Sequence, residues 1–587
     1  MSIGSSVRLD QVGQAFSPGH VLFEGLSCRL TADNIYAVTG PSGSGKSTLL
    51  GILAGWIKPT SGTVTCDGVQ SIQWVFQNPH GVAHRTALDH VTLPLVAQGM
   101  DRRQADESAL KLLSEFGLSG VADSPFALLS GGEAQRLMLA RGVAANPDML
   151  LVDEPTAQLD RRTADEVNQS LKALADRGVI VVIATHDPKT ASACTSVIDL
   201  EHVPAAATAS VSIAEDAAPA DASYRRPLIA SREAAREAWR NLATGTSRAM
   251  AWALALFALT ALLGGLDAWS VKTVVDGAVE YRSQGGAVWV LDAPNLVDGR
   301  ACDALSGAGA IESAGALRQD SDGLTTATLP RSPIPLFSVT PGFASVVGVQ
   351  SPSPGVGIWI TDSVAARYGT AGSGIISTSS GPVRVDGVFG YPDDGRSGNL
   401  GFAALAPSSA SDENFDQCWM TVWPADDSAQ ALARTALAPT ADDATLSQVK
   451  FYQLNPTVAS SFPGLTDFLQ RPSRLAPWVA LFCAAALGLV ASWSRRLEQA
   501  SGLHAGLPKS FLLQMTVIET AAWALPAVIL ASPLVIFVAT QAGADNLFVA
   551  LSGVRPLAAG LAGAVLGSAL GVLLVHERQL FNLFKNR

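Results

Sequence analysis

The chain has 587 residues, of which 48% are hydrophobic and 16% are charged, and its formal net charge at pH 7 is -11. This length exceeds what a single hydrophobic core supports, so several domains are expected. The acidic balance excludes nucleic acid as the main partner, because binding to phosphate backbones requires a basic surface. The composition is too apolar for a purely soluble enzyme and too polar for a chain buried entirely in lipid, so it indicates both soluble and membrane-embedded parts.

Residues 1–203 alternate short β-branched runs with helical stretches, and this alternation predicts an α/β domain. The chain opens with MSIGSSVRLD, which has no apolar run behind it. We therefore expect no signal peptide and an N-terminus that stays in the cytoplasm. Residues 204–228 are poor in large apolar side chains, and they are predicted to form a flexible linker.

Four long apolar stretches follow the linker, and each approaches or exceeds the roughly 20 residues that a helix needs to cross a bilayer. They occupy residues 249–268, 475–493, 512–540 and 556–575. A buried helix of a soluble protein is the alternative for any single stretch. Because there are four of them, we predict an all-α, four-helix transmembrane domain.

Basic residues predict the orientation of these stretches. Six arginines precede the first stretch, three lysines or arginines lie between the second and third, and three follow the fourth. By the positive-inside rule these regions are cytoplasmic, so the chain is expected to be a multi-pass protein of the inner or plasma membrane. Residues 494–511 are then a cytoplasmic loop, 576–587 a cytoplasmic tail, and 269–474 and 541–555 are extracytoplasmic.

Two features flank or mark the spans. Residues 229–248 mix arginines with Trp239 and alanines, which predicts an amphipathic helix on the inner leaflet, with a solvated linker helix as the alternative. In the last stretch, Gly563, Gly567 and Gly571 recur every four residues. Small residues at this spacing allow two helices to approach closely, although glycines facing lipid would have the same spacing.

A phosphate-binding motif lies near the N-terminus. The sequence GPSGSGKST matches the pattern G-x-x-x-x-G-K-[ST] between an apolar run and a helical stretch, which favours a phosphate site over a chance glycine-rich loop. Backbone N–H groups of such a loop converge on phosphate oxygens, Lys46 supplies charge to the β- and γ-phosphates, and Ser47 offers a hydroxyl to Mg²⁺. The ATP-binding residues predicted here are Gly40, Pro41, Ser42, Gly43, Ser44, Gly45, Lys46, Ser47 and Thr48.

Two later apolar runs end in residues suited to hydrolysis. The run MLLVDEP predicts a buried strand that delivers Asp153 to Mg²⁺ and Glu154 to the attacking water, whose proton Glu154 would accept. The alternative is that either acid is a surface residue that follows the strand and has no role in hydrolysis. The run VIVVIATHD predicts another buried strand, and His186 at its end is either structural or a sensor of the γ-phosphate.

In this order, the motifs resemble the ATP-binding cassette (ABC) family over residues 1–203, which we call the cassette. The resemblance implies that Phe16 stacks on adenine, in a position where tyrosine is commoner. It also implies that Gln77 contacts ATP and Mg²⁺, and that Asp160 contacts ATP from the loop AQLD, which departs slightly from the usual forms.

The stretch LSGGEAQR is similar to the ABC signature loop, and the resemblance assigns Ser130, Gly131, Gly132 and Glu133 to ATP binding. In ABC proteins two cassettes face each other head to tail, and this loop of one chain covers the γ-phosphate held by Lys46 of the other. The resemblance therefore implies a homodimer, or a heterodimer with a similar chain, that uses ATP and Mg²⁺.

The order of domains resembles the MacB branch of ABC transporters, which is related to the FtsX and lipoprotein-releasing proteins. The resemblance implies an α+β extracytoplasmic domain of two lobes, and a short coupling helix in the loop 494–511 that rests on the cassette. Glu519 falls about two turns into the third span, where a buried acid is costly. We expect it to pair with a neighbouring helix or with the coupling region.

Two of the six cysteines, Cys302 and Cys418, fall in the extracytoplasmic part of the chain. That compartment is oxidising, so these residues are predicted to form a disulfide, with two unrelated buried thiols as the alternative.

Two functions are compatible with the sequence, and a third is not. The first is an ATP-driven transporter that moves its extracytoplasmic domains to export or extract a peptide, lipoprotein or amphiphilic drug. The second is a transmembrane regulator, as in the cell-division branch, that activates a cell-wall hydrolase or works with another extracytoplasmic accessory protein. A soluble ABC ATPase acting on DNA or ribosomes conflicts with the four apolar stretches.

Overall fold

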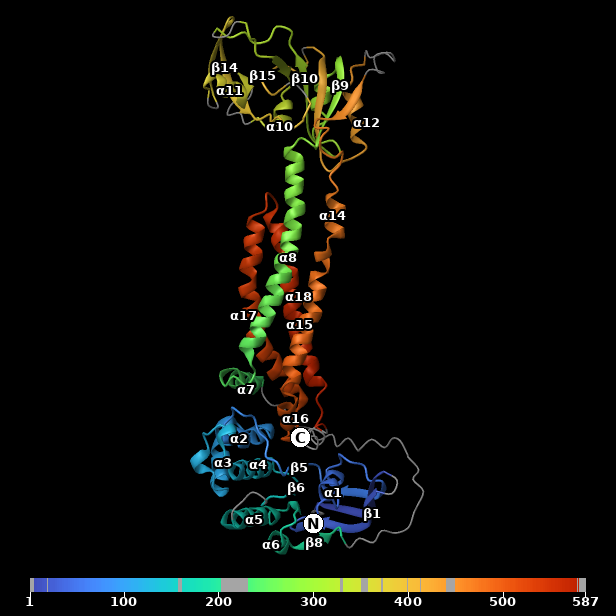
Figure 1. The fold of residues 1–587 in the computed structure, drawn as a ribbon, viewed down its shortest axis with the longest axis vertical. Helices are drawn as coiled ribbons and strands as arrows, with labels where there is room; N and C mark the ends of the chain where they lie inside the picture. The colour runs from blue at the N-terminus through green and yellow to red at the C-terminus, as the bar shows by residue number, and fades with distance from the viewer. Residues whose placement is uncertain are drawn as a thin grey trace. The chain divides into compact units, whose positions relative to one another are not determined.

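The computed structural model describes residues 5–17, 20–156, 161–201, 231–327, 331–349, 357–370, 373–397, 400–411, 413–439, 449–577 and 579. The chain divides into two compact units (Figure 1). Unit 1 comprises Met1–Gly264, Leu475–Leu534 and Val554–Arg587, and unit 2 comprises Gly265–Arg474 and Val535–Gly553. The predicted linker at 204–228 lies outside the described residues.

The cassette contains two sheets. The antiparallel sheet has the order β2-β1-β4, formed by β1 (Ser6–Ser17), β2 (His20–Thr31) and β4 (Ser61–Asp67). The parallel sheet has the order β5-β6-β7-β3-β8, formed by β3 (Ile35–Thr39), β5 (Ile72–Val75), β6 (Met149–Asp153), β7 (Ile180–Ala184) and β8 (Ser196–Asp199). β6 and β7 are buried along their whole length, which explains their continuous apolar sequences.

Helices complete the α/β cassette, as predicted. They are α1 (Lys46–Leu53), α2 (Ala87–Ala97), α3 (Arg102–Glu115), α4 (Gly131–Ala144), α5 (Arg161–Ala175) and α6 (Pro188–Ser192). One hydrophobic cluster joins α2, α3, α4 and α5 to the parallel sheet. Because the carboxyl ends of parallel strands meet at one edge, the segments that follow β3, β6 and β7 lie together there.

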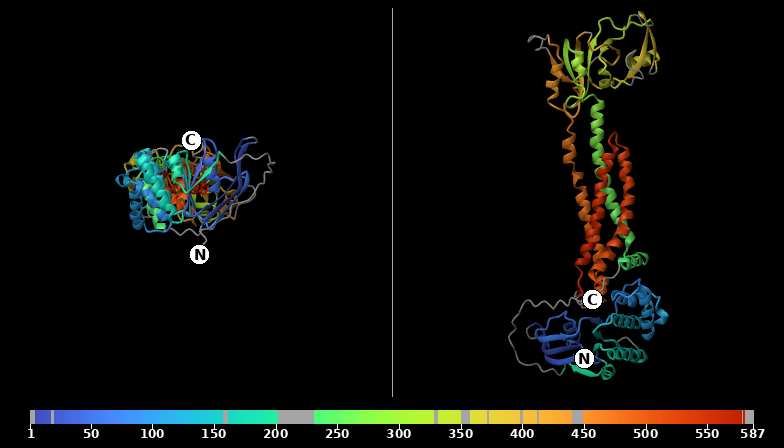
Figure 2. Two further views of the ribbon diagram at one scale, coloured as in Figure 1. Left: turned by 90° about the horizontal axis from the view of Figure 1, so that it is seen from below. Right: turned by 180° about the vertical axis from the view of Figure 1, so that it is seen from behind.

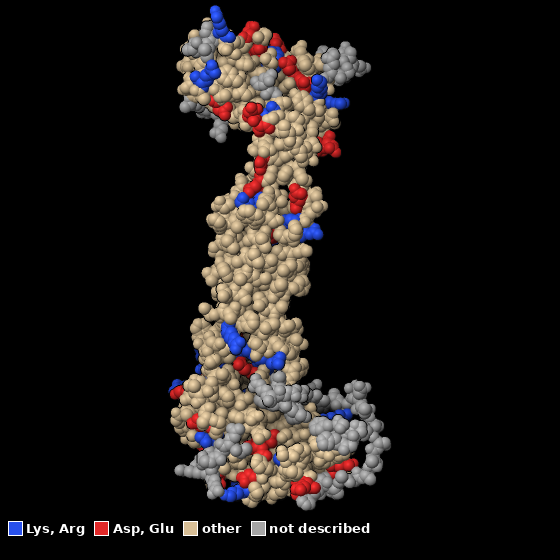
Figure 3. Space-filling model, viewed as in Figure 1, with Lys and Arg blue, Asp and Glu red and all other residues tan. Residues whose placement is uncertain are grey.

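Among the described residues, four helices are long and apolar enough to cross a membrane. They are α8 (Ala249–Ser283), α15 (Ala476–Trp493), α17 (Lys509–Thr540) and α18 (Asn546–Leu573). On the face drawn in Figure 3, the surface along these helices is almost free of charged side chains. Large apolar side chains of these helices, such as Phe482 of α15 and Ile529 of α17, are exposed, as expected for contact with lipid.

Two of these helices are longer than the apolar stretches that predicted them. α8 continues past residue 268 to Ser283, and α18 begins at Asn546 rather than at residue 556. The apolar pattern marks only the part of a helix suited to lipid, whereas the backbone hydrogen bonds of the helix continue through polar residues.

The glycines of the last span lie against α15, and the two helices run side by side (Figures 1 and 2). A Cβ atom added at Gly567 would fall far inside van der Waals distance of the Ala485 carbonyl oxygen, and one at Gly563 would meet that of Leu481. Gly488 of α15 meets α18 in the same way. The glycines therefore serve helix contact and do not face lipid.

Unit 2 contains a single mixed sheet with the strand order β13-β14-β12-β15-β11-β10-β16-β9-β17. The strands are β9 (Val288–Val297), β10 (Ile311–Gln319), β11 (Leu336–Val339), β12 (Ile358–Thr361), β13 (Gly374–Thr378), β14 (Gly381–Phe389), β15 (Ala404–Pro407), β16 (Phe415–Val422) and β17 (Lys450–Gln453). Short helices accompany it: α9 (Gly299–Asp303), α10 (Phe343–Val347), α11 (Asp362–Tyr368), α12 (Ala429–Ala433) and α14 (Gly464–Gln470). The expected α+β domain is present, and instead of two separate lobes one hydrogen-bonded sheet carries three hydrophobic clusters.

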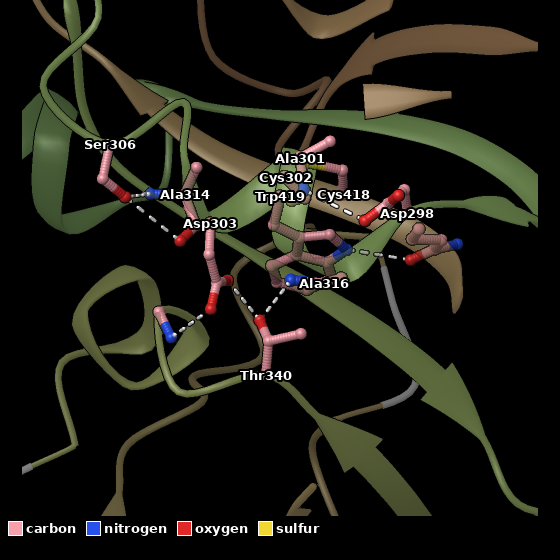
Figure 4. The surroundings of a disulfide bond; sticks show 12 residues. Asp298, Ala301, Cys302, Asp303, Ser306, Ala314, Ala316, Thr340, Cys418 and Trp419 are labelled. Carbon is pink, nitrogen blue, oxygen red and sulfur yellow. Dashed lines mark hydrogen bonds between the residues drawn. A yellow bond between two sulfur atoms is a disulfide. The ribbon is translucent and has the colours of Figure 1, made fainter. Parts of the chain in front are cut away.

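The predicted disulfide between Cys302 and Cys418 is present, and it joins α9 to β16 across a sequence separation of 116 residues (Figure 4). Both cysteines are fully buried in one hydrophobic cluster. Asp298 caps α9 by accepting hydrogen bonds from two backbone N–H groups, which positions Cys302 against the sheet.

Replacing both cysteines, as Cys302→Ala/Cys418→Ala, should destabilise unit 2 by about 2–5 kcal/mol, because the crosslink restricts the unfolded chain. Hydrogen exchange of β10 and β16 in the full chain would measure this loss of protection. The control is Cys66→Ala, which removes an exposed thiol from β4. Equal protection in both variants would contradict a stabilising role for the disulfide.

Gly567→Ala tests the contact between α15 and α18. Alanine favours an isolated helix over glycine by about 1 kcal/mol. Overpacking against Ala485 should nevertheless destabilise the bundle by roughly 1–3 kcal/mol, which lowers the thermal unfolding temperature in detergent. Leu566→Ala, at a neighbouring position where the side chain is 62% exposed, should change stability much less. A gain in stability for Gly567→Ala would show that the helices do not pack as described.

Candidate nucleotide site

The phosphate-binding loop follows β3 and ends where α1 begins at Lys46. Gly45 has a φ of 98°, in the left-handed region that favours glycine, and a Cβ there would stand 3.1 Å from the Phe23 ring. The Lys46 Nζ donates hydrogen bonds to the carbonyl oxygens of Gly40 at 2.8 Å and Pro41 at 3.2 Å. The ammonium group thus lies across the loop, at the N-terminus of a helix, where an anion is stabilised.

Ser47 and Asp153 come together at the end of the parallel sheet. The Ser47 hydroxyl donates a 2.7 Å hydrogen bond to the Asp153 carboxylate, which is buried. Burial raises the pKa of Asp153, and the hydrogen bond from Ser47 offsets part of this increase. A hydroxyl beside a buried carboxylate is a set of oxygen ligands that suits Mg²⁺, whose charge would stabilise the ionised acid.

Gln77, the other predicted ligand of Mg²⁺, lies in the segment after β5 and is exposed. Among the described residues, it forms no hydrogen bond with Ser47 or Asp153. The structure thus brings together two of the three predicted metal ligands.

Glu154 and His186 meet because they follow the neighbouring strands β6 and β7. The Glu154 Oε1 lies 2.8 Å from the His186 Nδ1. Glu154 has a φ of 52°, which is strained for a residue other than glycine, and its backbone N–H donates to Ala184. The Glu154 carboxylate is buried, whereas 68% of the His186 side chain is exposed. The imidazole holds the carboxylate in one orientation. A general base requires such a fixed acceptor within hydrogen-bond reach of the proton that it removes.

The signature residues form the N-terminus of α4. Ser130 and Glu133 cap the helix reciprocally: the Ser130 hydroxyl accepts from the Glu133 N–H at 3.3 Å, and the Glu133 carboxylate accepts from the Ser130 N–H at 2.9 Å. Hydrogen bonds from Ser130 lower the pKa of Glu133. In the described residues no hydrogen bond links this loop to Lys46 or Ser47, and Figure 1 shows α4 beside α2 and α3. The two glycine-rich loops therefore do not form one site within the chain.

Two predicted contacts cannot be placed. Phe16 lies in β1, but its side chain is outside the described part of the structure. Asp160 lies in the undescribed residues 157–160. Their roles in ATP binding remain predictions.

The loop between the second and third spans, which is predicted to be cytoplasmic, contains the helix α16 (Arg496–His504). The Trp74 N–H of β5 donates to the His504 Nε2 at 2.9 Å, and the Gln73 side chain donates to the His504 carbonyl at 2.5 Å. The Arg141 guanidinium of α4 donates to the Ser501 carbonyl at 2.8 Å. α16 thus contacts the strand that leads to Gln77 and the helix that begins with the signature residues.

Sequence reasoning did not identify Arg141 and His504 as functional residues. Neither belongs to a recognisable motif, and the contacts link positions separated by more than 350 residues along the chain. Arg141 is half-buried and His504 is buried, but burial is not visible in the sequence.

Comparison with known proteins identifies the family. Residues 23–157 match the ABC transporter family model. The lipoprotein-releasing system ATP-binding protein LolD 1 of Rhodospirillum rubrum is 35% identical over 215 residues, which cover 33% of this chain and 95% of that relative. This chain belongs to the ABC transporter family. LolD of Geobacter metallireducens is 38% identical over 187 residues, covering 29% of this ABC transporter and 83% of the relative.

The similarity extends beyond the ATP-binding part. The macrolide export ATP-binding/permease protein MacB of Salmonella typhimurium is 32% identical over 297 residues, an alignment longer than the cassette of this ABC transporter. The alignment covers 46% of this chain and 45% of MacB. The matched part thus spans less than half the length of the MacB relative.

Ser47→Ala tests the metal site. Removing the hydroxyl should raise the Mg²⁺ concentration needed for half-maximal binding of a fluorescent ATP analogue by on the order of tenfold, since a bond to a charged group contributes roughly 1.5–3 kcal/mol. Ser42→Ala makes the same chemical change in the same loop and should leave the Mg²⁺ dependence unchanged. An unchanged Mg²⁺ dependence in Ser47→Ala would exclude Ser47 as a ligand.

Proposed function

We propose that this ABC transporter is of the MacB type and uses ATP hydrolysis to move its extracytoplasmic domains. The proposed work is the export or extraction of a peptide, lipoprotein or amphiphilic drug. The observation that carries the proposal is the position of α16, which contacts both β5 and α4. Any relative movement of these two elements must displace α16 and, with it, the membrane helices that flank it in the chain.

A dimer of cassettes supplies the complete nucleotide site in this proposal. The Lys46 loop and the Ser130 loop are both intact in sequence, yet they lie on different helices without a direct hydrogen bond in the described residues. Ser130, Gly131 and Gly132 of one copy would cover the γ-phosphate bound at Lys46 of the other. A similar chain in a heterodimer would serve equally well.

Hydrolysis follows from residues at the edge of the sheet. Lys46 and the backbone N–H groups of the loop bind the phosphates, and Ser47 and Asp153 would hold Mg²⁺, which would supply positive charge to them. Glu154 orients a water molecule and accepts its proton. His186 fixes the direction of the Glu154 carboxylate and contacts the γ-phosphate from its exposed side.

We infer that the cassette is cytoplasmic and that unit 2 is largely extracytoplasmic, in an inner or plasma membrane. The proposal is supported by the four apolar helices and by the basic residues at their cytoplasmic ends. The disulfide of unit 2 fits an oxidising compartment.

The relatives' names suggest the class of cargo to test. MacB is named for macrolide export and LolD for lipoprotein release. We therefore expect an amphiphilic molecule to stimulate ATP hydrolysis by the protein in nanodiscs. Stimulation by a cell-wall hydrolase, and by no amphiphile, would instead support a regulatory function.

Glu154→Gln should retain ATP binding and lose at least about a hundredfold of the hydrolysis rate, the scale of general-base catalysis. The measurements are release of phosphate and binding of a fluorescent ATP analogue by the full chain in nanodiscs. Lys46→Ala is the matched comparison, because it should weaken nucleotide binding itself. Substantial hydrolysis by Glu154→Gln would mean that another residue is the base.

A further inference from the structure

Helix α7 (Ser231–Ala243), which precedes the first span, has two different faces. One face is buried and carries Glu237 and Asn241, while Trp239 on the other side is 71% exposed. The exposed face suits the predicted position at the inner leaflet. The sequence did not predict the contacts of the buried face, which packs on the cassette and on α17.

Toward the cassette, Glu237 binds two arginines of the segment around α2 and α3. Its carboxylate oxygens lie 2.7 Å from Arg85 and 2.7 Å from Arg102. The neighbouring Arg240 of α7 binds Asp89 of α2 at 2.6 Å. Glu237 and Arg85 are buried, so these ion pairs are poorly screened by solvent.

Toward the membrane, Asn241 continues the same network. Its side-chain oxygen accepts a 2.9 Å hydrogen bond from Arg85, and its amide nitrogen donates to Glu519 of α17. The second carboxylate oxygen of Glu519 lies 2.5 Å from Arg495, which directly precedes α16. Glu519 is thus paired as expected, both with a neighbouring helix and with the coupling region.

The covalent path from this network to the nucleotide site is short. Arg85 lies at the end of the segment that begins with Gln77, directly before α2. The backbone of Arg85 also accepts a hydrogen bond from Phe126, in the segment that leads to the signature residues. A change in position of either segment therefore moves the Arg85 guanidinium.

Packing beside the network is incomplete. A cavity of ≈ 100 Å³ is lined by Arg85, Glu237, Asn241 and Arg495 together with apolar residues of α16 and α17. The contact combines apolar packing, to which Ala234 and Ala238 of α7 contribute, with directional polar bonds beside the cavity. Such bonds break when their geometry changes, and a buried ion network contributes little to stability compared with an apolar replacement.

We propose that Glu237 and Asn241 are positioning residues that make α7 a second mechanical link, separate from α16, between the cassette and α17. The inference rests on the proposed function, because it supposes that ATP moves the membrane helices. In this arrangement, a movement of Arg85 displaces α7 through Glu237 and Asn241. It also displaces Glu519, to which Asn241 is hydrogen-bonded. The position of α17 therefore depends on the cassette at two points.

Glu237→Gln tests the link, with Glu233→Gln as the matched control on the same helix. Glu233 pairs with the half-exposed Arg236 of its own helix and does not bind the cassette arginines in the described structure. A spin label at Ile529 of α17, in a background without the four free cysteines, would report the distance between the two copies in nanodiscs. The distance is compared with and without ATP in the hydrolysis-deficient Glu154→Gln chain.

We expect Glu237→Gln to reduce the ATP-dependent displacement of the α17 label at least about twofold. The affinity for a fluorescent ATP analogue should stay within about twofold of the parent, because Glu237 pairs with no residue of the phosphate loop in the described structure. Glu233→Gln should behave as the parent does. Asn241→Leu provides an independent test, since it removes the link to Glu519 and keeps Glu237 paired.

The outcomes separate the two proposals. If the parent chain shows no ATP-dependent displacement, the proposed transmission of movement is wrong. If the parent moves, and Glu237→Gln and Asn241→Leu both move as far, the second link is wrong and the proposed function stands. Equal losses in Glu237→Gln and Glu233→Gln would also contradict a specific role for Glu237.

Discussion

Helix α16 is held to the cassette by hydrogen bonds to His504 and Ser501 from two different elements, β5 and α4. The same helix contributes Ala500 and Leu503 to a hydrophobic cluster that includes residues of the cassette sheets and of α17. Apolar burial makes this contact stable, and the hydrogen bonds determine its register. This contact joins the cassette to the membrane helices, so the nucleotide site and the parts of the membrane helices next to α16 belong to the same compact unit.

The nucleotide site is organised by a parallel sheet, which brings Asp153, Glu154 and His186 to one edge near Ser47. In the proposed function, this edge binds the phosphates and Mg²⁺ from one side. In the described residues, it forms no hydrogen bond with the signature residues. The N-terminus of α4 offers N–H donors at a separate place in the same fold. In the proposed dimer, α4 of one copy would meet the nucleotide bound by the other. The same helix binds α16 through Arg141.

Much of the fold could be predicted from the sequence, because its chemistry requires particular residue types. A phosphate loop needs glycines and a lysine, and a lipid-spanning helix needs a long apolar run, so these elements are visible locally. The pairing of Cys302 with Cys418 was predicted because both cysteines fall in the part of the chain expected to lie in an oxidising compartment. α8 and α18 extend beyond the predicted spans, because apolar content ends before helical hydrogen bonding does. The network from Arg85 through Asn241 to Glu519 could not be predicted, since it depends on tertiary contacts between ordinary polar residues.

In the proposed function, ATP bound between two cassettes changes the arrangement of the extracytoplasmic domains. The most direct measurement is the distance between spin labels at Ile375, an exposed residue of unit 2, in two copies of the Glu154→Gln chain in nanodiscs. If ATP binding moves these domains, the distance shifts when ATP and Mg²⁺ are added. It does not shift in the chain that also carries Lys46→Ala. An unchanged distance, under conditions in which ATP binds and the cassettes associate, would show that ATP does not move these domains.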